Sequence, residues 1–167
     1  LLVFPWDQVS AAGYCTQQRG RPFLFIYKEK GDKLVTIPKE YGDFELTLEL
    51  KVDPKLNSGI QIRSLCKDEP YKPTLELANG NTWTPTEPIP AGRVHGYQVE
   101  IDPDVKRARD WTAGVYDEGR RGWLNDLSEN EPARKAFKPG EWNRIRVEAI
   151  GDSILALDWT PIGADGW

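Results

Sequence analysis

Apolar and polar residues alternate strictly along one stretch near the end of the first third of the chain. From Phe44 to Val52 every even position is apolar and every odd position is polar. A period of two residues is typical of a strand with one buried face. Asp53-Pro54 ends the pattern, because proline has no amide hydrogen to give to a sheet. We therefore predict a strand over residues 44–52.

Similar alternation recurs further along the chain. It predicts strands at Ile60–Arg63, Tyr97–Asp102 and Trp142–Ile150, and shorter ones at Phe23–Tyr27, Ala113–Tyr116 and Ser153–Leu157. Pro132–Phe137 is predicted as one helical turn, and the proline-rich stretch 66–92 as a long loop.

No segment has a sustained helical period, so the sequence predicts an all-β fold, an antiparallel β-sandwich. The residues expected between its sheets are Phe44, Leu46, Leu48, Ile60, Ile62, Val99, Ile101, Ile145 and Val147. Trp142 is also expected in the core.

Composition narrows the class of protein. Of the 167 residues, 39% are hydrophobic and 29% charged, which indicates a globular domain rather than a disordered or membrane-spanning chain. The net charge of −4 and the scattered basic residues argue against nucleic-acid binding. Cys15 and Cys66 are too far apart in the sequence to match the spacing of a metal-binding motif. The sequence is compatible both with a disulfide between them and with two free thiols.

The richest chemistry lies between Arg93 and Trp123. Glu100 and Asp102 fall on one face of a predicted strand with Cα atoms ~6.6 Å apart, so their carboxyls can reach the separation of roughly 5–9.5 Å used by glycosidases. The alternative is a solvated outer face. His95 is the only histidine, and a general base, a metal ligand and a structural residue all stay open.

Arginine and aromatic residues add candidates for ligand binding. Arg121 lies in a turn with Asp117, Glu118 and Arg120, which are predicted either to pair among themselves or to clamp a substrate. The stacking candidates are Trp83, Trp111, Tyr116 and Trp123. No multi-histidine metal site is compatible with one histidine, and a divalent cation held by Glu100, Asp102 and carbonyl oxygens stays an option.

Four blocks of the chain then point to one family. Tyr41–Arg63 (YGDFELTLELKVDPKLNSGIQIR) strongly resembles the domain labelled 3-keto-disaccharide hydrolase, formerly a domain of unknown function. Similar blocks follow in order at His95–Pro103 (HGYQVEIDP), Gly114–Leu124 (GVYDEGRRGWL) and Lys138–Ile154 (KPGEWNRIRVEAIGDSI). The resemblance covers about 34–154.

The resemblance implies a concanavalin A-like or laminin-G-like jelly roll over 34–167, preceded by a segment of unclear structure at 1–33. It further implies a concave sugar-binding groove between polar strand faces. The residues expected there are Asn57, Gln61, Arg63, Gln98, Glu100 and Asp102. The implied activity is cleavage of glycosides oxidised at carbon 3, with His95 or Glu100 as the base and Arg63, Arg121 or a cation as the electrophile.

The same resemblance leaves two other functions open. One is a non-catalytic subunit of an extracytoplasmic complex, peripheral to a membrane at most; the other is a carbohydrate-binding module. The family pattern continues past Ile154 into closing strands that do not follow here, so we expect residues 152–167 to contact another polypeptide. A carbohydrate ligand and a periplasmic or secreted location are expected as well.

Overall fold

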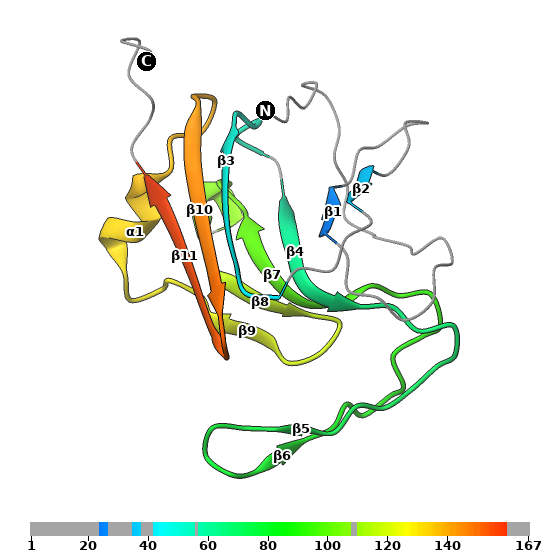
Figure 1. Cartoon of the computed structure of the whole chain (residues 1–167). Coiled ribbons are helices and arrows are strands. Elements are labelled where there is room, and N and C mark those ends of the chain that lie inside the picture. Colours follow the sequence, from blue (N-terminus) through cyan, green and yellow to red (C-terminus); the bar gives the residue numbers. More distant parts are fainter. Residues whose placement is uncertain (1–23, 27–34, 38–41, 56, 108–109, 160–167) are drawn as a thin grey trace.

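The computed structural model describes residues 24–26, 35–37, 42–55, 57–107 and 110–159, and most of its regular structure is β-strand (Figure 1). The strands are β1 (Leu24–Ile26), β2 (Val35–Ile37), β3 (Phe44–Leu50), β4 (Ser58–Leu65), β5 (Leu75–Glu76), β6 (Thr82–Trp83), β7 (His95–Ile101), β8 (Val115–Glu118), β9 (Gly122–Asn125), β10 (Asn143–Ile150) and β11 (Ser153–Trp159). A 3-10 turn, η1, spans Val105–Arg107, and one short helix, α1, spans Glu131–Ala136.

These strands form two main sheets, and every pairing is antiparallel. The larger sheet has the order β2-β1-β4-β7-β8-β9, and the smaller has the order β11-β10-β3. The predicted all-β, antiparallel sandwich is confirmed. β1 belongs to the stretch whose structure the sequence left unclear, and it pairs with β4 through Phe25 and Gln61. The domain boundary at residue 33 stays a prediction.

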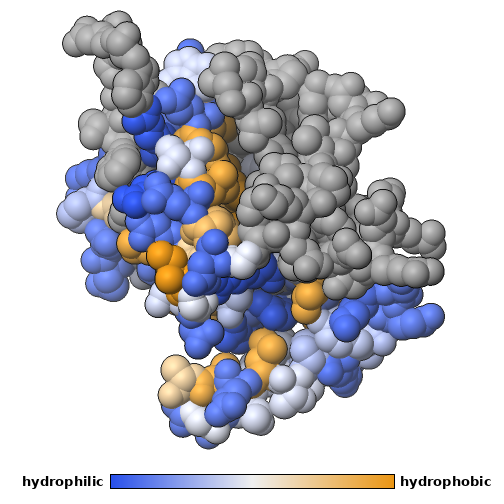
Figure 2. Space-filling view, in the orientation of Figure 1, coloured by the Kyte–Doolittle hydropathy of each residue, from blue (hydrophilic) through white to orange (hydrophobic). Residues whose placement is uncertain are grey.

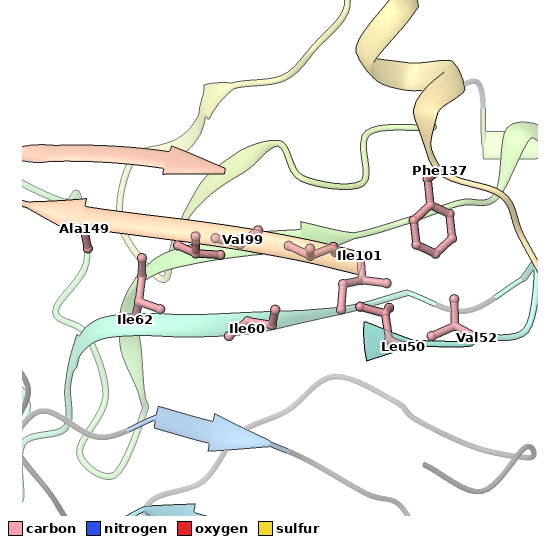
Figure 3. Close-up of a cluster of buried hydrophobic side chains, with 10 residues drawn as sticks. Leu50, Val52, Ile60, Ile62, Val99, Ile101, Phe137 and Ala149 are labelled. Carbon is pink, nitrogen blue, oxygen red and sulfur yellow. The ribbon is translucent and has the colours of Figure 1, made fainter. Parts of the chain in front are cut away.

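The core lies between the two sheets (Figure 3). Ile60 and Ile62 from β4 and Val99 and Ile101 from β7 face β10, where Ile145 and Val147 are fully buried. These six residues were predicted. Phe44, Leu46 and Leu48 pack against this core but are only half-buried, because β3 is an edge strand of the smaller sheet. The sequence prediction missed Leu50, Val52, Phe137 and Ala149.

Two local predictions are wrong. Trp142 is 39% exposed rather than buried, since β10 begins one residue later and its inward positions are Asn143 and Ile145. The stretch 66–92 is not a plain loop, because β5 and β6 pair within it and Tyr71 bridges to Ile89. This hairpin extends away from the sandwich (Figure 1).

The strand predicted at residues 153–157 is β11, which lies at an edge of the smaller sheet among the described strands. β1 does not close that edge, since it pairs in the other sheet. Leu155 on β11 is 48% exposed, and Figure 2 shows small apolar patches within a mostly hydrophilic surface. Residues 160–167 and the side chain of Trp159 lie outside the described residues. Contact of this edge with another chain stays a prediction.

No helix within the described ranges is long and apolar enough to cross a bilayer. Cys66 is half-buried, and Cys15 lies outside the described residues.

Candidate functional site

One row of side chains crosses four strands on the face of the larger sheet that points away from the smaller one, here called the outer face. Gln61 on β4 pairs with Gln98 on β7, Gln98 with Tyr116 on β8, and Tyr116 with Trp123 on β9. Directly paired residues point to the same side of a sheet, and successive residues alternate. The apolar neighbours of Gln61 and Gln98 fill the core, so this row faces outward.

Glu100 is held in place beside this row. It is only 4% exposed, and each carboxylate oxygen accepts one amide hydrogen bond. Asn57 Nδ2 donates to Oε1 at 2.8 Å, and Gln98 Nε2 donates to Oε2 at 2.8 Å. The two amides fix the orientation of the carboxylate.

The position of Gln98 depends on Gly59, which pairs with Glu100 across the strands. A β-carbon at Gly59 would lie 2.4 Å from the Gln98 side chain, which real contacts do not reach. The absence of a side chain at Gly59 therefore leaves the space in which Gln98 crosses to β4 and reaches Glu100.

Further hydrogen bonds extend from Gln98 along β4. Gln61 Nε2 donates to Gln98 Oε1 at 3.3 Å, and Ser64 Oγ donates to Gln61 Oε1 at 3.1 Å. Every donor in this series points toward Glu100, an order that favours a negative charge at its end. We call Asn57, Gln61, Ser64, Gln98 and Glu100 the carboxylate network.

Three aromatic rings pack together next to the carboxylate network. Trp111 and Trp123 meet edge to face with ring centroids 4.7 Å apart, and Tyr116 meets Trp123 at 5.1 Å. Edge-to-face packing is a favourable arrangement for such rings, and aromatic faces can also cover the apolar face of a ligand. This aromatic cluster contains three of the four stacking candidates from the sequence.

A second group of polar residues lies at the start of β7 and the end of β8. It is here called the end cluster and consists of Tyr71, His95, Asp117, Arg120 and Arg121. Asp117 pairs with Tyr97 in register, and Tyr97 packs against the core, so Asp117 faces the opposite side from Gln98. Asp117 is fully buried and binds Arg120 at 2.6 Å and Arg121 at 2.5 Å. Both guanidinium groups also lie over the Tyr97 ring, at 5.2 and 5.8 Å.

His95 belongs to the end cluster and is fully buried. Its Nδ1 lies 2.9 Å from the carbonyl oxygen of Arg93, which can only accept, so Nδ1 carries the proton. Nε2 then accepts a hydrogen bond from the Tyr71 hydroxyl. Burial is the main cause that lowers the pKa of His95, and Arg120 and Arg93 lower it further, against hydrogen bonding to Arg93 and the charge of Asp117. Burial raises the pKa of Tyr71. His95 is therefore neutral at pH 7.

The structure thus brings together most of the predicted ligand-binding residues. The carboxylate network and the aromatic cluster contain Asn57, Gln61, Gln98, Glu100, Trp111, Tyr116 and Trp123. Glu100 and Asp102 are not the solvated surface charges of the alternative reading, because Asp102 is also fully buried.

The structure places four other predicted residues elsewhere, and the expectation that Arg63 shares a groove with Gln98 and Glu100 is wrong. Arg63 has a φ of 46°, and the pairing shifts between Ile62 and Leu65. This bulge redirects Arg63 to the carbonyl oxygen of Gly151 and to Asp43 at 3.4 Å. His95 and Arg121 lie in the end cluster, and Trp83 lies on the β5–β6 hairpin.

Sequence reasoning missed other members of these groups. Tyr71 comes from the stretch predicted as a loop, and no pattern in the sequence relates it to His95. Asp117 was expected to form surface ion pairs with its neighbours; it does pair with them, but in a buried position. Within the described ranges, no group of three or more His, Cys, Asp or Glu side chains could hold a metal ion.

The chain is thus a β-sandwich with an oriented carboxylate on the outer face of its larger sheet and aromatic rings on the neighbouring strands. The family model for the 3-keto-alpha-glucoside-1,2-lyase-like domain matches residues 23–157, and the chain belongs to this family. The family's name indicates a carbohydrate-related, hydrolase- or lyase-like function. No curated protein matches the chain.

Proposed function

We propose that this domain cleaves 3-keto-glucosides on the outer face, with Glu100 as the base. The observation that carries the proposal is the Glu100 carboxylate, which is 4% exposed and oriented by two amide donors beside the aromatic cluster. A base must be held within hydrogen-bond reach of the proton that it removes, and Asn57 and Gln98 provide that orientation. The name of the family supports a 3-keto-glucoside as the substrate.

The reaction follows from the chemistry of a ketone at carbon 3 of the sugar. That ketone acidifies the hydrogen on carbon 2, which Glu100 removes as a proton. The electron pair of the broken C–H bond is first held as an enolate on the ketone and then forms a double bond between carbons 1 and 2. The bond from carbon 1 to the glycosidic oxygen breaks, and that oxygen leaves with its electrons and takes up a proton. Addition of water across the double bond would give net hydrolysis.

Negative charge develops on the ketone oxygen during this elimination, and a donor near that oxygen would lower the barrier. The arginines expected in this role lie elsewhere, since Arg63 reaches Gly151 and Arg121 binds Asp117. Tyr116 neighbours Gln98 on the next strand, and its hydroxyl is a neutral donor on the outer face. We assign Tyr116 the electrophilic role and His95 none, because both His95 nitrogens are engaged in the end cluster.

The test uses p-nitrophenyl 3-keto-α-glucoside, whose leaving group is coloured. The wild-type protein should release nitrophenol, and in deuterated buffer the substrate recovered before completion should carry deuterium at carbon 2. Glu100→Gln should lower both signals about 10²- to 10⁴-fold, whereas Tyr116→Phe should slow both to a smaller extent. Neither nitrophenol release nor deuterium exchange by the folded wild type would overturn the proposal.

A carbohydrate-binding module is the second candidate. The observation favouring it is that both Glu100 oxygens already accept amide hydrogen bonds, as they would in a site that only orients a sugar hydroxyl. Tight binding of the 3-keto-glucoside without either signal above would select this function. A periplasmic or secreted location would suit both candidates.

A further inference from the structure

A tight turn over residues 111–114 leads into β8, and its backbone departs from what its residues prefer. Gly114 N donates to the Trp111 carbonyl oxygen at 2.8 Å, which closes the turn. Ala113, the third of the four residues, has a φ of 71°, and no other residue of the turn has a positive φ. This is the geometry of a type II turn, whose third residue is normally glycine. The β-carbon of Ala113 makes its left-handed conformation strained.

The same turn carries a second cost in stability. Thr112 is only 1% exposed, and within the described ranges no group forms a hydrogen bond with its hydroxyl. A buried polar group without a partner destabilises a fold, so such groups are uncommon in native proteins. Two costs in adjacent residues are typical of segments whose conformation is kept for function, because the surrounding structure must hold them in place.

The turn lies directly opposite Glu100 on β7. Ala113 N donates to the Glu100 carbonyl oxygen at 2.9 Å, and Glu100 N donates to the Gly114 carbonyl oxygen at 2.8 Å. Two consecutive residues thus oppose one residue of the neighbouring strand, which is the pattern of a β-bulge. Ala113 occupies the first position of this bulge, where a glycine in the left-handed conformation is usual. The bulge fixes both backbone groups of Glu100.

The other end of the turn contacts the aromatic cluster. Trp111 begins the turn and packs edge to face against Trp123 with ring centroids 4.7 Å apart. A β-carbon at Gly114 would lie 2.9 Å from the Trp111 carbonyl oxygen and 3.1 Å from the Trp123 ring. The turn and the rings are therefore in close contact. A change in the conformation of these four residues would shift Glu100 relative to the aromatic cluster.

We infer that Ala113 is a positioning residue, whose left-handed conformation sets the direction of the Glu100 carboxylate relative to Trp111 and Trp123. The inference rests on the proposed function, because it takes Glu100 to be the base. The two side-chain amides orient the carboxylate, and the bulge orients the backbone that carries it. Bulges can re-aim a side chain in this way because they bend the strand and increase its local twist. The conformation of Ala113 matters here, and its methyl group does not.

Two substitutions at position 113 separate the conformation from the side chain. Ala113→Gly permits the left-handed conformation without strain, so the urea midpoint should rise and kcat should keep its wild-type value. Ala113→Val opposes that conformation, because a β-branched residue rarely adopts a positive φ. Its kcat for p-nitrophenyl 3-keto-α-glucoside should fall about 10- to 100-fold, as when a reacting group is displaced by about 1 Å. KM should stay unchanged, because the base acts only in the transition state.

Rates are compared per folded molecule, with the folded fraction taken from urea unfolding of the same preparation. Ala91→Val is the matched control, because Ala91 is exposed and has no positive φ, and it should leave kcat unchanged. Should Ala113→Val fail to fold, Gly114→Ala takes its place. It adds one methyl group to the same bulge, against the Trp111 carbonyl oxygen, and should lower kcat in the same way.

The outcomes distinguish the positioning role from the proposed function. Wild-type kcat in the folded fraction of the variant that disturbs the bulge would overturn the positioning role and leave the proposed function standing. Equal losses of kcat in Ala113→Gly and Ala113→Val would overturn it as well, because the methyl group and not the conformation would then matter. Neither turnover nor deuterium exchange by the folded wild type would overturn the proposed function, and the positioning role with it.

Discussion

The carboxylate network and the end cluster both centre on a buried carboxylate, and the two differ in what surrounds it. Neutral amides hold Glu100, whereas the arginines Arg120 and Arg121 hold Asp117. A carboxylate paired with two cations is compensated, and its charge serves the fold. One that accepts hydrogen bonds from side-chain amides is held in a fixed orientation on the outer face. The comparison teaches that burial alone does not identify a base, because the groups that orient the carboxylate and the face on which it lies matter as well.

The largest effect is expected from breaking the end cluster. Asp117→Asn should lower the free energy of unfolding by about 3–5 kcal/mol, because it leaves two largely buried guanidinium groups without their shared counter-ion. Urea unfolding would measure this change. Glu118→Gln is the control, since Glu118 pairs with the exposed Arg93 and should cost about 1 kcal/mol or less. Equal losses for the two variants would contradict the structural role of Asp117.

Glu100→Gln should show the opposite profile. Turnover of a 3-keto-glucoside should fall about 10²- to 10⁴-fold, the usual contribution of a positioned base. The loss of stability should stay near 1–2 kcal/mol, because the substitution keeps the shape of the side chain and leaves one amide donor without its acceptor. Initial rates and urea unfolding on the same preparation would separate the two effects. A variant that loses stability like Asp117→Asn would make Glu100 a structural carboxylate as well.

Gly59→Ala tests the network without removing any polar group. The new β-carbon would displace the flexible Gln98 side chain, so Glu100 would lose the hydrogen bond from Gln98. We expect turnover to fall about tenfold and stability to fall by about 1 kcal/mol, as for one lost hydrogen bond. Gly42→Ala is the matched control, because nothing lies within 4 Å of a β-carbon there. Similar rates for the two variants would show that the orientation of Glu100 does not depend on Gln98.

The end cluster should also give the protein a pH-dependent stability. Burial lowers the pKa of His95 in the folded protein below 6.5, so the unfolded chain takes up a proton first as the pH falls. The stabilisation is complete above pH 6.5 and should be lost progressively below it. Unfolding by urea between pH 7.5 and about pH 5, above the range of most carboxylates, would show this decline.

His95 is the only histidine, so His95→Gln should flatten the dependence in that window. A decline that persists in His95→Gln would assign it to other groups.

Strand alternation in the sequence predicted the site wherever the strands are regular. The buried residues Ile60 and Ile62 flank Gln61, and the buried Val99 and Ile101 flank Glu100. Alternate residues of a strand point to the same side, so the sequence places Gln61, Gln98 and Glu100 together on the outer face. The physical reason is the fixed period of two residues in a strand.

Strand alternation gave wrong side-chain directions where the backbone departs from that period. The bulge between Ile62 and Leu65 redirects Arg63, and the φ of 143° at Gly96 departs from regular strand geometry next to His95; neither is evident from residue type alone. Tyr71 reaches His95 from outside the predicted strands, and such a contact depends on the path of residues 66–92. The strand residues Gln61, Gln98 and Glu100 of the carboxylate network were therefore predictable, whereas Ser64 and the end cluster were not.

The pairing of β3 with β10 also governs how the chain can fold. Arg146 binds Glu45 across a separation of 101 residues, and Asp43 accepts a hydrogen bond from the Gly151 amide across 108. Closing such long loops costs entropy before any contact repays it, so sandwiches of this kind fold slowly, on a scale of about milliseconds to seconds. During synthesis the apolar side chains of β3 stay uncovered until β10, near the end of the described chain, has emerged from the ribosome. For that time they are accessible to other chains, with which they can aggregate, and to chaperones.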